Sequence, residues 1–217
     1  MLATRAIVVG IALVLFAAPA AAVVPVDPGR EAPEPRLVGY QLPVAVPLVL
    51  DPLLLPGAPR EYRAGYHEGI DFRAPYGMPV RAARDGVVVR VDTRYTEWSA
   101  DERAAALAAA VRNGGVSGEV LDLIRGRQVW IDHGDGVVTR YAHLSRVAEL
   151  RVGERVAAGE VIGAVGASGL PEGGPHLHFE IRVGDGFLGE GLSVETVRYV
   201  VSSAFSASSP RLPVRVY

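Results

Sequence analysis

Between Gly65 and Val183, the sequence consists mainly of short runs of β-branched and other apolar residues separated by glycines. Runs of this kind predict β-strands, and their even spacing indicates an antiparallel barrel or sandwich. Asp135 and Gly136, which follow Gly134, predict a tight hairpin. We therefore expect a mainly β fold with a small antiparallel core. The expected strands cover 79–84, 86–91, 128–132, 136–143, 151–156, 160–165 and 176–183.

One segment of the β domain has a helical pattern instead. Ser99 and Glu102 stand at capping-box spacing, an alanine-rich run extends to Arg112, and two glycines follow. A second short helix is expected over 118–124. The sequence thus predicts a helical insertion at about 94–126, which is too long for a bare loop. It is either an addition without function or a lid or wall beside an active site.

The segments on either side of the β domain, which we expect to cover 61–185, differ from it in composition. Residues 23–60 carry nine prolines, a density that excludes helices and central strands, so an extended lead-in is expected. Residues 186–217 form a C-terminal extension. Its apolar pattern near 193–203 fits either a helix or a strand.

The amino end predicts an export signal at 1–22. Arg5 precedes thirteen uncharged, mostly apolar residues, and the alanines at 20–22 suit a cleavage site. The alternative is an uncleaved membrane anchor, because the uncharged stretch continues to Val26 and approaches the roughly 20 residues that a span needs. In both cases the protein is expected to work outside the cytoplasm, in the periplasm, the cell wall or the medium. No membrane contact is expected unless the segment stays uncleaved.

Composition excludes several kinds of site. The chain has no cysteine, so disulfides and thiolate metal sites are impossible, and any metal must be held by histidines and carboxylates. None of its 22 basic residues is lysine. This excludes a biotinyl or lipoyl carrier domain, although 81–91 and 151–162 are similar to the half-motifs of such domains. A net charge of −2 gives no basic surface for nucleic acid.

The first of three histidine motifs is His67-Glu68-Gly69-Ile70-Asp71. On a straight strand, residues four apart share a face but lie about 13 Å apart, too far to bind one ion. Gly69 permits a bend that would bring His67 and Asp71 together. The alternative is a hydrogen-bonded structural pair.

The second motif, His176-Leu177-His178-Phe179-Glu180, has the alternation of a strand. A period of two puts His176 and His178 on one face, roughly 7 Å apart. One of them can bind an ion while the other stands beside the remaining coordination position. A structural role for both is equally compatible with the pattern.

The third motif, Tyr141-Ala142-His143-Leu144, ends the strand that follows the hairpin. His143 has the parity of Tyr141, so the two side chains are expected to face the same side. An isolated histidine here is also typical of a core or surface residue. His133, in the turn, is expected to be structural.

The three motifs in this order resemble those of the lysostaphin and LytM type of zinc metalloendopeptidase, which cleaves peptide cross-bridges of bacterial peptidoglycan. The resemblance covers about Gly65 to Val183. It implies a small antiparallel β core of the duplicated hybrid-motif or barrel-sandwich type and a single Zn²⁺ ion. The sequence departs from the family pattern in the insertion, in the 172–174 segment and in the C-terminal extension. The implied zinc ligands are His67, Asp71 and His178, and the implied catalytic residues are His143 and His176.

This set of residues suits amide hydrolysis. Two imidazoles and a carboxylate leave the fourth position of the ion open for water, whose pKa then falls from 15.7 toward roughly 7. The catalytic histidines would transfer protons and stabilise the oxyanion. The resemblance implies an endopeptidase acting on peptidoglycan stem peptides or cross-bridges. The alternatives are a non-catalytic LytM-type scaffold that activates other wall hydrolases and a zinc peptidase acting on free proteins.

Overall fold

The computed structural model describes residues 35–206. The expected export signal at 1–22, the first part of the lead-in and residues 207–217 therefore lie outside the described part of the chain. The strands are β1 (Pro59–Arg60), β2 (Gly65–Tyr66), β3 (Ile70–Arg73), β4 (Pro79–Arg81), β5 (Gly86–Val91), β6 (Val129–Asp132), β7 (Val137–Ala142), β8 (Leu144–Val147), β9 (Arg155–Val156), β10 (Val161–Val165), β11 (His176–Val183) and β12 (Gly186–Phe187). The helices are α1 (Ala100–Asn113), α2 (Gly118–Arg125) and α3 (Val194–Phe205), with short 3₁₀-helices η1 (Pro35–Leu37), η2 (Pro52–Leu54), η3 (Glu61–Arg63) and η4 (Pro171–Gly173).

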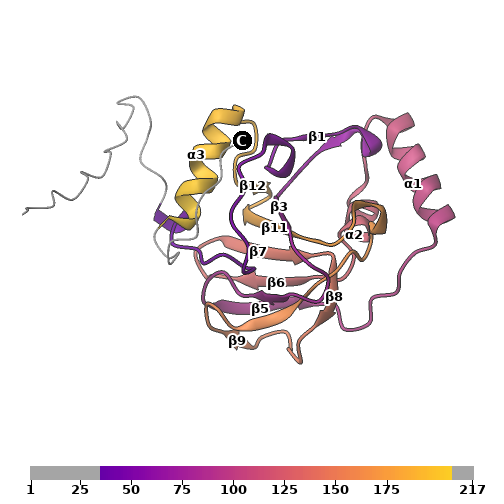
Figure 1. Ribbon diagram of the computed structural model, residues 1–217. Coiled ribbons are helices and arrows are strands. Elements are labelled where there is room, and N and C mark those ends of the chain that lie inside the picture. The colour runs from indigo at the N-terminus through magenta and orange to yellow at the C-terminus, as the bar shows by residue number, and fades with distance from the viewer. Residues whose placement is uncertain (1–34, 207–217) are drawn as a thin grey trace, which may run out of the picture. The chain divides into compact units, whose positions relative to one another are not determined.

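All of the strand pairs are antiparallel, as the sequence predicted. The larger sheet has the order β12-β11-β7-β6-β5-β9, and β3 pairs with the first four residues of β11, His176 to Phe179. A second sheet has the order β4-β10-β8, and β1 and β2 form a short hairpin (Figure 1). The fold is therefore mainly β with an antiparallel core, and the predicted fold class is confirmed.

Most of the expected strands are present, and the differences have local causes. The strand expected at 136–143 is β7, which ends at Ala142 because His143 adopts a left-handed backbone with φ of 60°. The next strand, β8, begins at Leu144 and was not expected. The strand expected at 151–156 shortens to β9, since Gly153 turns the chain with φ of 90°. The hairpin predicted at Asp135-Gly136 joins β6 to β7.

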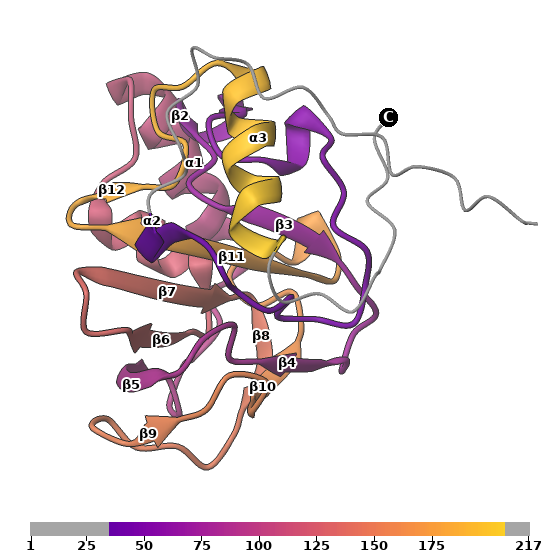
Figure 2. The ribbon, with the colours of Figure 1, turned by 90° about the vertical axis from the view of Figure 1, so that its left-hand side faces the viewer.

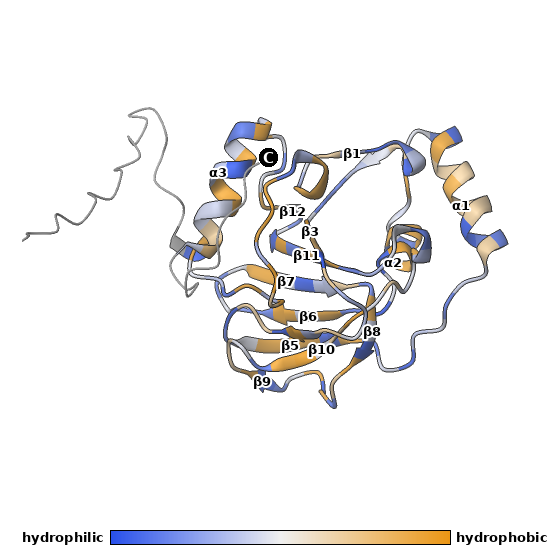
Figure 3. Cartoon of the chain, in the orientation of Figure 1, coloured by the Kyte–Doolittle hydropathy of each residue, from blue (hydrophilic) through white to orange (hydrophobic). Residues whose placement is uncertain are grey.

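The core contains buried residues of both sheets and of α3, and its aromatic part lies between the larger sheet and α3. Tyr141 and Phe179 face each other with ring centroids 5.2 Å apart. Phe205 of α3 packs edge-on against Phe72, with centroids 6.0 Å apart, and also contacts Phe179. Figure 2 shows α3 crossing β3 and β11, and Figure 3 shows apolar residues along the strands and on α3. The tail segment that fitted either a helix or a strand is thus a helix that belongs to the core.

The described part of the lead-in is built into the domain. Tyr40, Leu48 and Leu55 are buried in the core, and the Tyr40 amide donates to the Ala204 carbonyl oxygen of α3 at 2.9 Å. The prediction that residues 23–60 contain no helix was wrong, because η1 and η2 lie within this range. A three-residue 3₁₀-helix can begin with proline because the first amide of a helix needs no intrahelical acceptor.

Both helices of the insertion occur where the sequence predicts them. The Ser99 side chain accepts from the Glu102 amide, and the Glu102 carboxylate accepts from the Ser99 amide, so the predicted capping box is confirmed. Gly114 ends α1 in the left-handed conformation. Within residues 35–206, no helix has both the length and the apolar character needed to cross a bilayer.

The packing of α3 can be tested with Phe205→Ala. Phe205 is 3 % exposed, and losing its ring contacts should lower the free energy of unfolding by about 3 kcal/mol. Val194→Ala, at an exposed position of the same helix, is the matched control and should change it by less than about 0.5 kcal/mol. Denaturant unfolding of the metal-free protein measures both. Equal stability of the two variants would show that α3 does not pack on the sheet.

Candidate metal centre

The three side chains implied as zinc ligands lie together. His67 follows β2, Asp71 lies in β3, and His178 lies in β11. The His67 Nε2 atom is 2.9 Å from Asp71 Oδ1 and 3.0 Å from His178 Nδ1, and His178 Nδ1 is 2.9 Å from Asp71 Oδ1. Each residue therefore presents one potential ligand atom to a common point, and the group could hold one metal ion.

Strand register brings two of these residues together. Asp71 and His178 are direct partners in the β3–β11 pairing, and side chains of such partners on one face touch. Gly69 allows the approach of the third. A Cβ atom at Gly69 would lie 2.5 Å from the Phe179 carbonyl oxygen and 2.9 Å from His178 Cε1. Glycine is required here because there is no space for a side chain. From the sequence we expected it for a bend instead, but Gly69 is not among the glycines with positive φ.

The second nitrogen of each ligand histidine is held by an oxygen. His67 Nδ1 donates to the Leu55 carbonyl oxygen at 2.9 Å, and His178 Nε2 donates to Glu180 Oε1 at 3.0 Å. Because these oxygens only accept, the protons lie on those nitrogens, and the lone pairs of His67 Nε2 and His178 Nδ1 face the Asp71 carboxylate.

Three facing lone pairs repel one another unless a cation or a shared proton lies between them. Two imidazole nitrogens and a carboxylate oxygen form a donor set typical of catalytic zinc, and tetrahedral ligands with bonds of about 2.0–2.2 Å lie about 3.3 Å apart. The separations of 2.9–3.0 Å here are close to that value. The residues therefore fit one Zn²⁺ ion.

The charges around the centre favour a ligand-competent state. Burial raises the pKa of Asp71, but the charge of His67 and the polar contacts with His178 and His67 outweigh it, so the pKa lies well below its ordinary value. Burial lowers the pKa of His67. Burial also lowers the pKa of His178, but hydrogen bonds to Asp71 and Glu180 raise it more. The carboxylate is therefore ionised at neutral pH, and protons compete with a metal less strongly at His67 and more strongly at His178 than at an ordinary histidine.

The two implied catalytic histidines flank the ligands. The rings of His143 and His176 have centroids 4.6 Å apart, and the His143 centroid is 5.7 Å from that of His178. His143 Nδ1 donates to the Ser168 carbonyl oxygen at 2.9 Å, and His176 Nδ1 donates to that of Gly174 at 2.8 Å. Each neutral ring therefore has an unprotonated Nε2.

The expectation that His143 and Tyr141 face the same side was wrong. Tyr141 is buried against Phe179 and accepts a hydrogen bond from the Ala83 amide at 2.8 Å. His143 lines the cavity that contains His178. The left-handed backbone of His143 interrupts the alternation of β7, and this turns the imidazole away from the core.

His133 lies outside this cluster, as expected. Its Nδ1 donates to the Asp85 carbonyl oxygen at 2.7 Å, and its Nε2 lies 3.0 Å from the Thr139 hydroxyl oxygen. The residue ties the β6–β7 hairpin to the start of β5.

Sequence reasoning missed the charged groups behind the ligands. Glu180 is fully buried, and besides His178 it accepts from Arg125 Nε at 2.6 Å. Burial raises the pKa of Glu180, but His178 and Arg125 hold it far below its ordinary value. Arg60 donates to Asp71 Oδ2 at 3.2 Å. The signal for Glu180 was its parity with His178, which places both residues on one strand face.

The helical insertion reaches this centre through α2. Arg125 is the last residue of α2, and besides Glu180 it binds Glu68 Oε2 at 2.5 Å. Asp122 of the same helix is held by two hydrogen bonds from Arg90 of β5, at 2.7 and 2.8 Å. The helix is thus fixed to the sheet at two points.

The first half of the insertion is attached to the loop before β11. Arg103 of α1 forms an ion pair with Glu172 at 2.5 Å, and the Trp98 indole donates to the Gly169 carbonyl oxygen at 2.8 Å. The loop that contains 172–174, where the sequence departs from the family pattern, is therefore in direct contact with the insertion.

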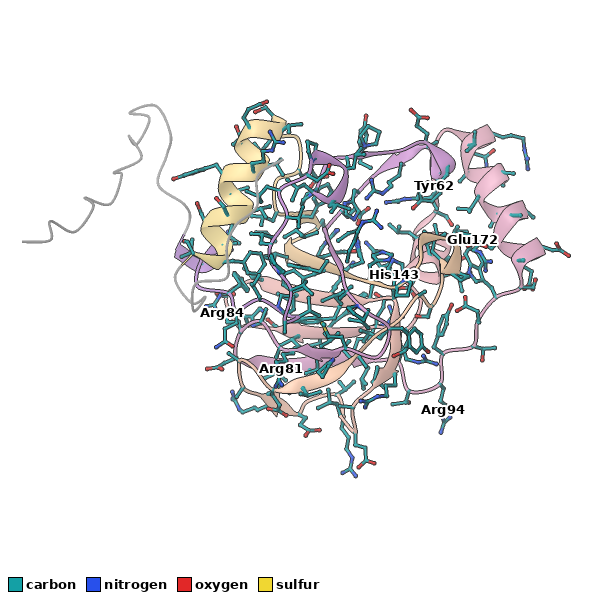
Figure 4. The ribbon with its side chains drawn as sticks, in the orientation of Figure 1. Tyr62, Arg81, Arg84, Arg94, His143 and Glu172 are labelled. Atoms are coloured by element: carbon teal, nitrogen blue, oxygen red, sulfur yellow. The ribbon has the colours of Figure 1, made fainter. Side chains whose placement is uncertain are left out.

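A cavity of about 330 Å³ opens over the ligands. His143 and His176 line its floor with the ligands, and its walls come from three segments: 53–63, the end of α2, and the loop around η4. In Figure 4, Tyr62 marks the first of these segments, His143 marks the floor, and Glu172 marks the loop around η4 without lining the cavity itself. The insertion is therefore a wall of the cavity.

Comparison with known proteins identifies the relatives of the chain. The DD-carboxypeptidase/endopeptidase Mpg of Neisseria meningitidis is 38% identical over 117 residues, which are 54% of this chain and 20% of that protein. The peptidoglycan DD-endopeptidase ShyC of Vibrio cholerae is 33% identical over 117 residues, with the same coverage of 54% and 20%. The chain spans about a fifth of the length of these curated relatives.

A solved structure and a family model extend the comparison. The catalytic domain of lysostaphin from Staphylococcus simulans is 29% identical, with 65% of this chain and 81% of that domain covered and a TM-score of 0.41. The model of Peptidase family M23 matches residues 65–189. This range contains the metal centre and both flanking histidines, and it is more than half of the sequence. The chain belongs to Peptidase family M23.

Proposed function

We propose that this protein is a zinc-dependent endopeptidase that hydrolyses peptide cross-links of bacterial peptidoglycan. The observation that carries the proposal is the convergence of His67, Asp71 and His178 in a cavity that two further histidines line. Membership of a peptidase family supports peptide hydrolysis. The name of the relative ShyC, a peptidoglycan DD-endopeptidase, supports peptidoglycan as the substrate. We also propose that the protein is exported, on the basis of residues 1–22.

The three converging residues would hold the zinc ion. The protonated nitrogens of the two histidines are held by oxygens, that of His67 by the Leu55 carbonyl and that of His178 by Glu180. The orientation of both rings is therefore set before metal binding. When bound, the ion would act as a Lewis acid that polarises the substrate carbonyl and increases the acidity of water.

His143 and His176 would carry the proton-transfer steps. Each presents an unprotonated Nε2, and each has a carbonyl oxygen at Nδ1 that stabilises the ring when it gains a proton. Burial, followed by the charges of His176 and His178, lowers the pKa of His143 to about 3. The ring is therefore neutral at pH 7 and keeps Nε2 free to accept a hydrogen bond from water, and its protonated form would be a strong acid toward the leaving amine.

Two alanine variants separate metal binding from catalysis. His178→Ala removes a ligand and should abolish both zinc binding and activity. His143→Ala should retain one zinc per chain but lose activity by a factor of about 10² to 10⁴. Elemental analysis gives the zinc content, and mass spectrometry of the muropeptides released from purified cell wall gives activity.

The matched control is His133→Ala, a histidine outside the cavity, which should retain zinc and activity. Full activity of the His143 variant would overturn the catalytic assignment. A wild-type protein that holds no zinc, releases no peptide and yet activates another wall hydrolase would support the scaffold alternative. Faster digestion of casein than of muropeptides would indicate a general peptidase.

The contact of the insertion with the metal centre gives a separate prediction. Arg125→Gln leaves the buried Glu180 with the His178 hydrogen bond at 3.0 Å and, among the arginines, only the longer contacts to Arg140 and Arg182 at 3.5 and 3.4 Å. We expect the free energy of unfolding to fall by about 3 kcal/mol and the zinc affinity to fall about 10- to 100-fold, because Glu180 orients His178. Arg112→Gln, at an exposed position of α1, is the control. Wild-type zinc affinity in the Arg125 variant would show that the insertion is not coupled to the metal centre.

A further inference from the structure

Arg63 is a buried cation in the wall of the cavity. It ends η3, four residues before His67, and is 4 % exposed. Its guanidinium donates to the Tyr66 carbonyl oxygen, whereas its Nε is buried without a hydrogen-bond partner. None of the ion pairs within residues 35–206 includes Arg63. The cavity wall thus holds a positive charge that forms no direct ion pair with a carboxylate of this range; Glu68 acts on it only from a longer distance.

The nearby acidic groups are already engaged. Glu68 accepts from Arg125 at 2.5 Å and from Arg182 at 2.7 Å. Glu180 accepts from Arg125 and lies within ion-pair distance of Arg140 and Arg182. The carboxylates of Glu68 and Glu180 therefore form ion pairs with three arginines. Arg63 adds a fourth positive charge to this side of the cavity.

An excess of buried positive charge destabilises the free protein and favours binding of an anion. Burial lowers the pKa of Arg63 by more than the neighbouring Tyr62 and Glu68 raise it. A guanidinium matches the geometry of a carboxylate. The volume of about 330 Å³ is that of a small-ligand site, so the anion must lie close to the scissile bond.

We propose that Arg63 binds a substrate carboxylate, and that the preferred peptides carry a free carboxylate on a residue that adjoins the scissile amide. The proposal rests on the peptidase function proposed above. It favours cross-links whose amine is donated by a diamino acid with a free carboxylate over neutral glycine bridges. Arg63 then acts as a specificity-determining residue in a wall of the cavity.

The test uses the full-length, zinc-loaded protein and two synthetic peptides. Both join D-alanine to an amine of diaminopimelate, with the carboxylate beside the scissile amide either free or amidated. The wild-type protein should cleave the free form with at least tenfold higher kcat/KM. Arg63→Gln should raise KM for the free form at least tenfold and leave the amidated form nearly unchanged. Arg63→Lys, which keeps the charge, should restore part of the preference.

Two further arginines serve as comparisons. Arg94→Gln makes the same charge change at an exposed position outside the cavity, labelled in Figure 4, and should behave as the wild type. Arg73 is the exposed arginine at the cavity edge, paired in register with His176. A preference that survives in the Arg63 variant, or is lost in Arg73→Gln instead, would overturn the assignment to Arg63.

A binding measurement separates this inference from the proposed function. The zinc-loaded His143→Ala protein should bind the free-carboxylate peptide at least tenfold more tightly than the amidated one by calorimetry. This result needs no Arg63 variant, so it stands even if Arg63→Gln fails to fold. Equal affinities overturn the carboxylate site. Selective binding by a wild-type protein that cleaves neither peptide would refute the peptidase function and retain the carboxylate site.

Discussion

The pairing of Asp71 with His178 across β3 and β11 is the contact on which the site depends. It brings a carboxylate and an imidazole to one point, and His67 completes the triangle. Because Leu55 and Glu180 fix the protons on the far side of both rings, the three lone pairs converge. Such an arrangement is stable around a cation and repulsive without one. The lack of space for a side chain at Gly69 and the burial of Glu180 both follow from this convergence.

A row of paired residues extends from the centre across the larger sheet. Glu180 pairs with Arg140, Arg140 with Trp130, and Trp130 with Arg90. The guanidinium carbon of Arg140 lies 3.9 Å from the centroid of the Trp130 ring, and that of Arg90 lies 4.7 Å from it. The two ends of the row hold α2, through Arg125 and Asp122. The same strand face therefore holds α2 and, through Glu180, orients His178, one of the proposed metal ligands. This attachment keeps the end of α2 in the wall of the cavity.

The sequence predicted the parts of this structure that depend on local pattern. Strand alternation located His178 and its neighbours, and cap residues located α1. Long-range effects were beyond its reach. The side on which His143 lies depends on a left-handed backbone at one residue, which parity cannot reveal. The partners of Arg125 and the isolation of Arg63 depend on contacts between distant segments, and the burial of Leu48 depends on how the proline-rich segment packs. The motif resemblance supplied the ligand set, and the structure supplied its surroundings.

The most direct test of the central claim is anomalous diffraction at the zinc edge from crystals of the zinc-loaded protein. The account predicts one strong peak in the cavity, about 2.0–2.2 Å from His67 Nε2, Asp71 Oδ1 and His178 Nδ1. A zinc peak at other residues, or these three side chains pointing away from a shared ion, would contradict it.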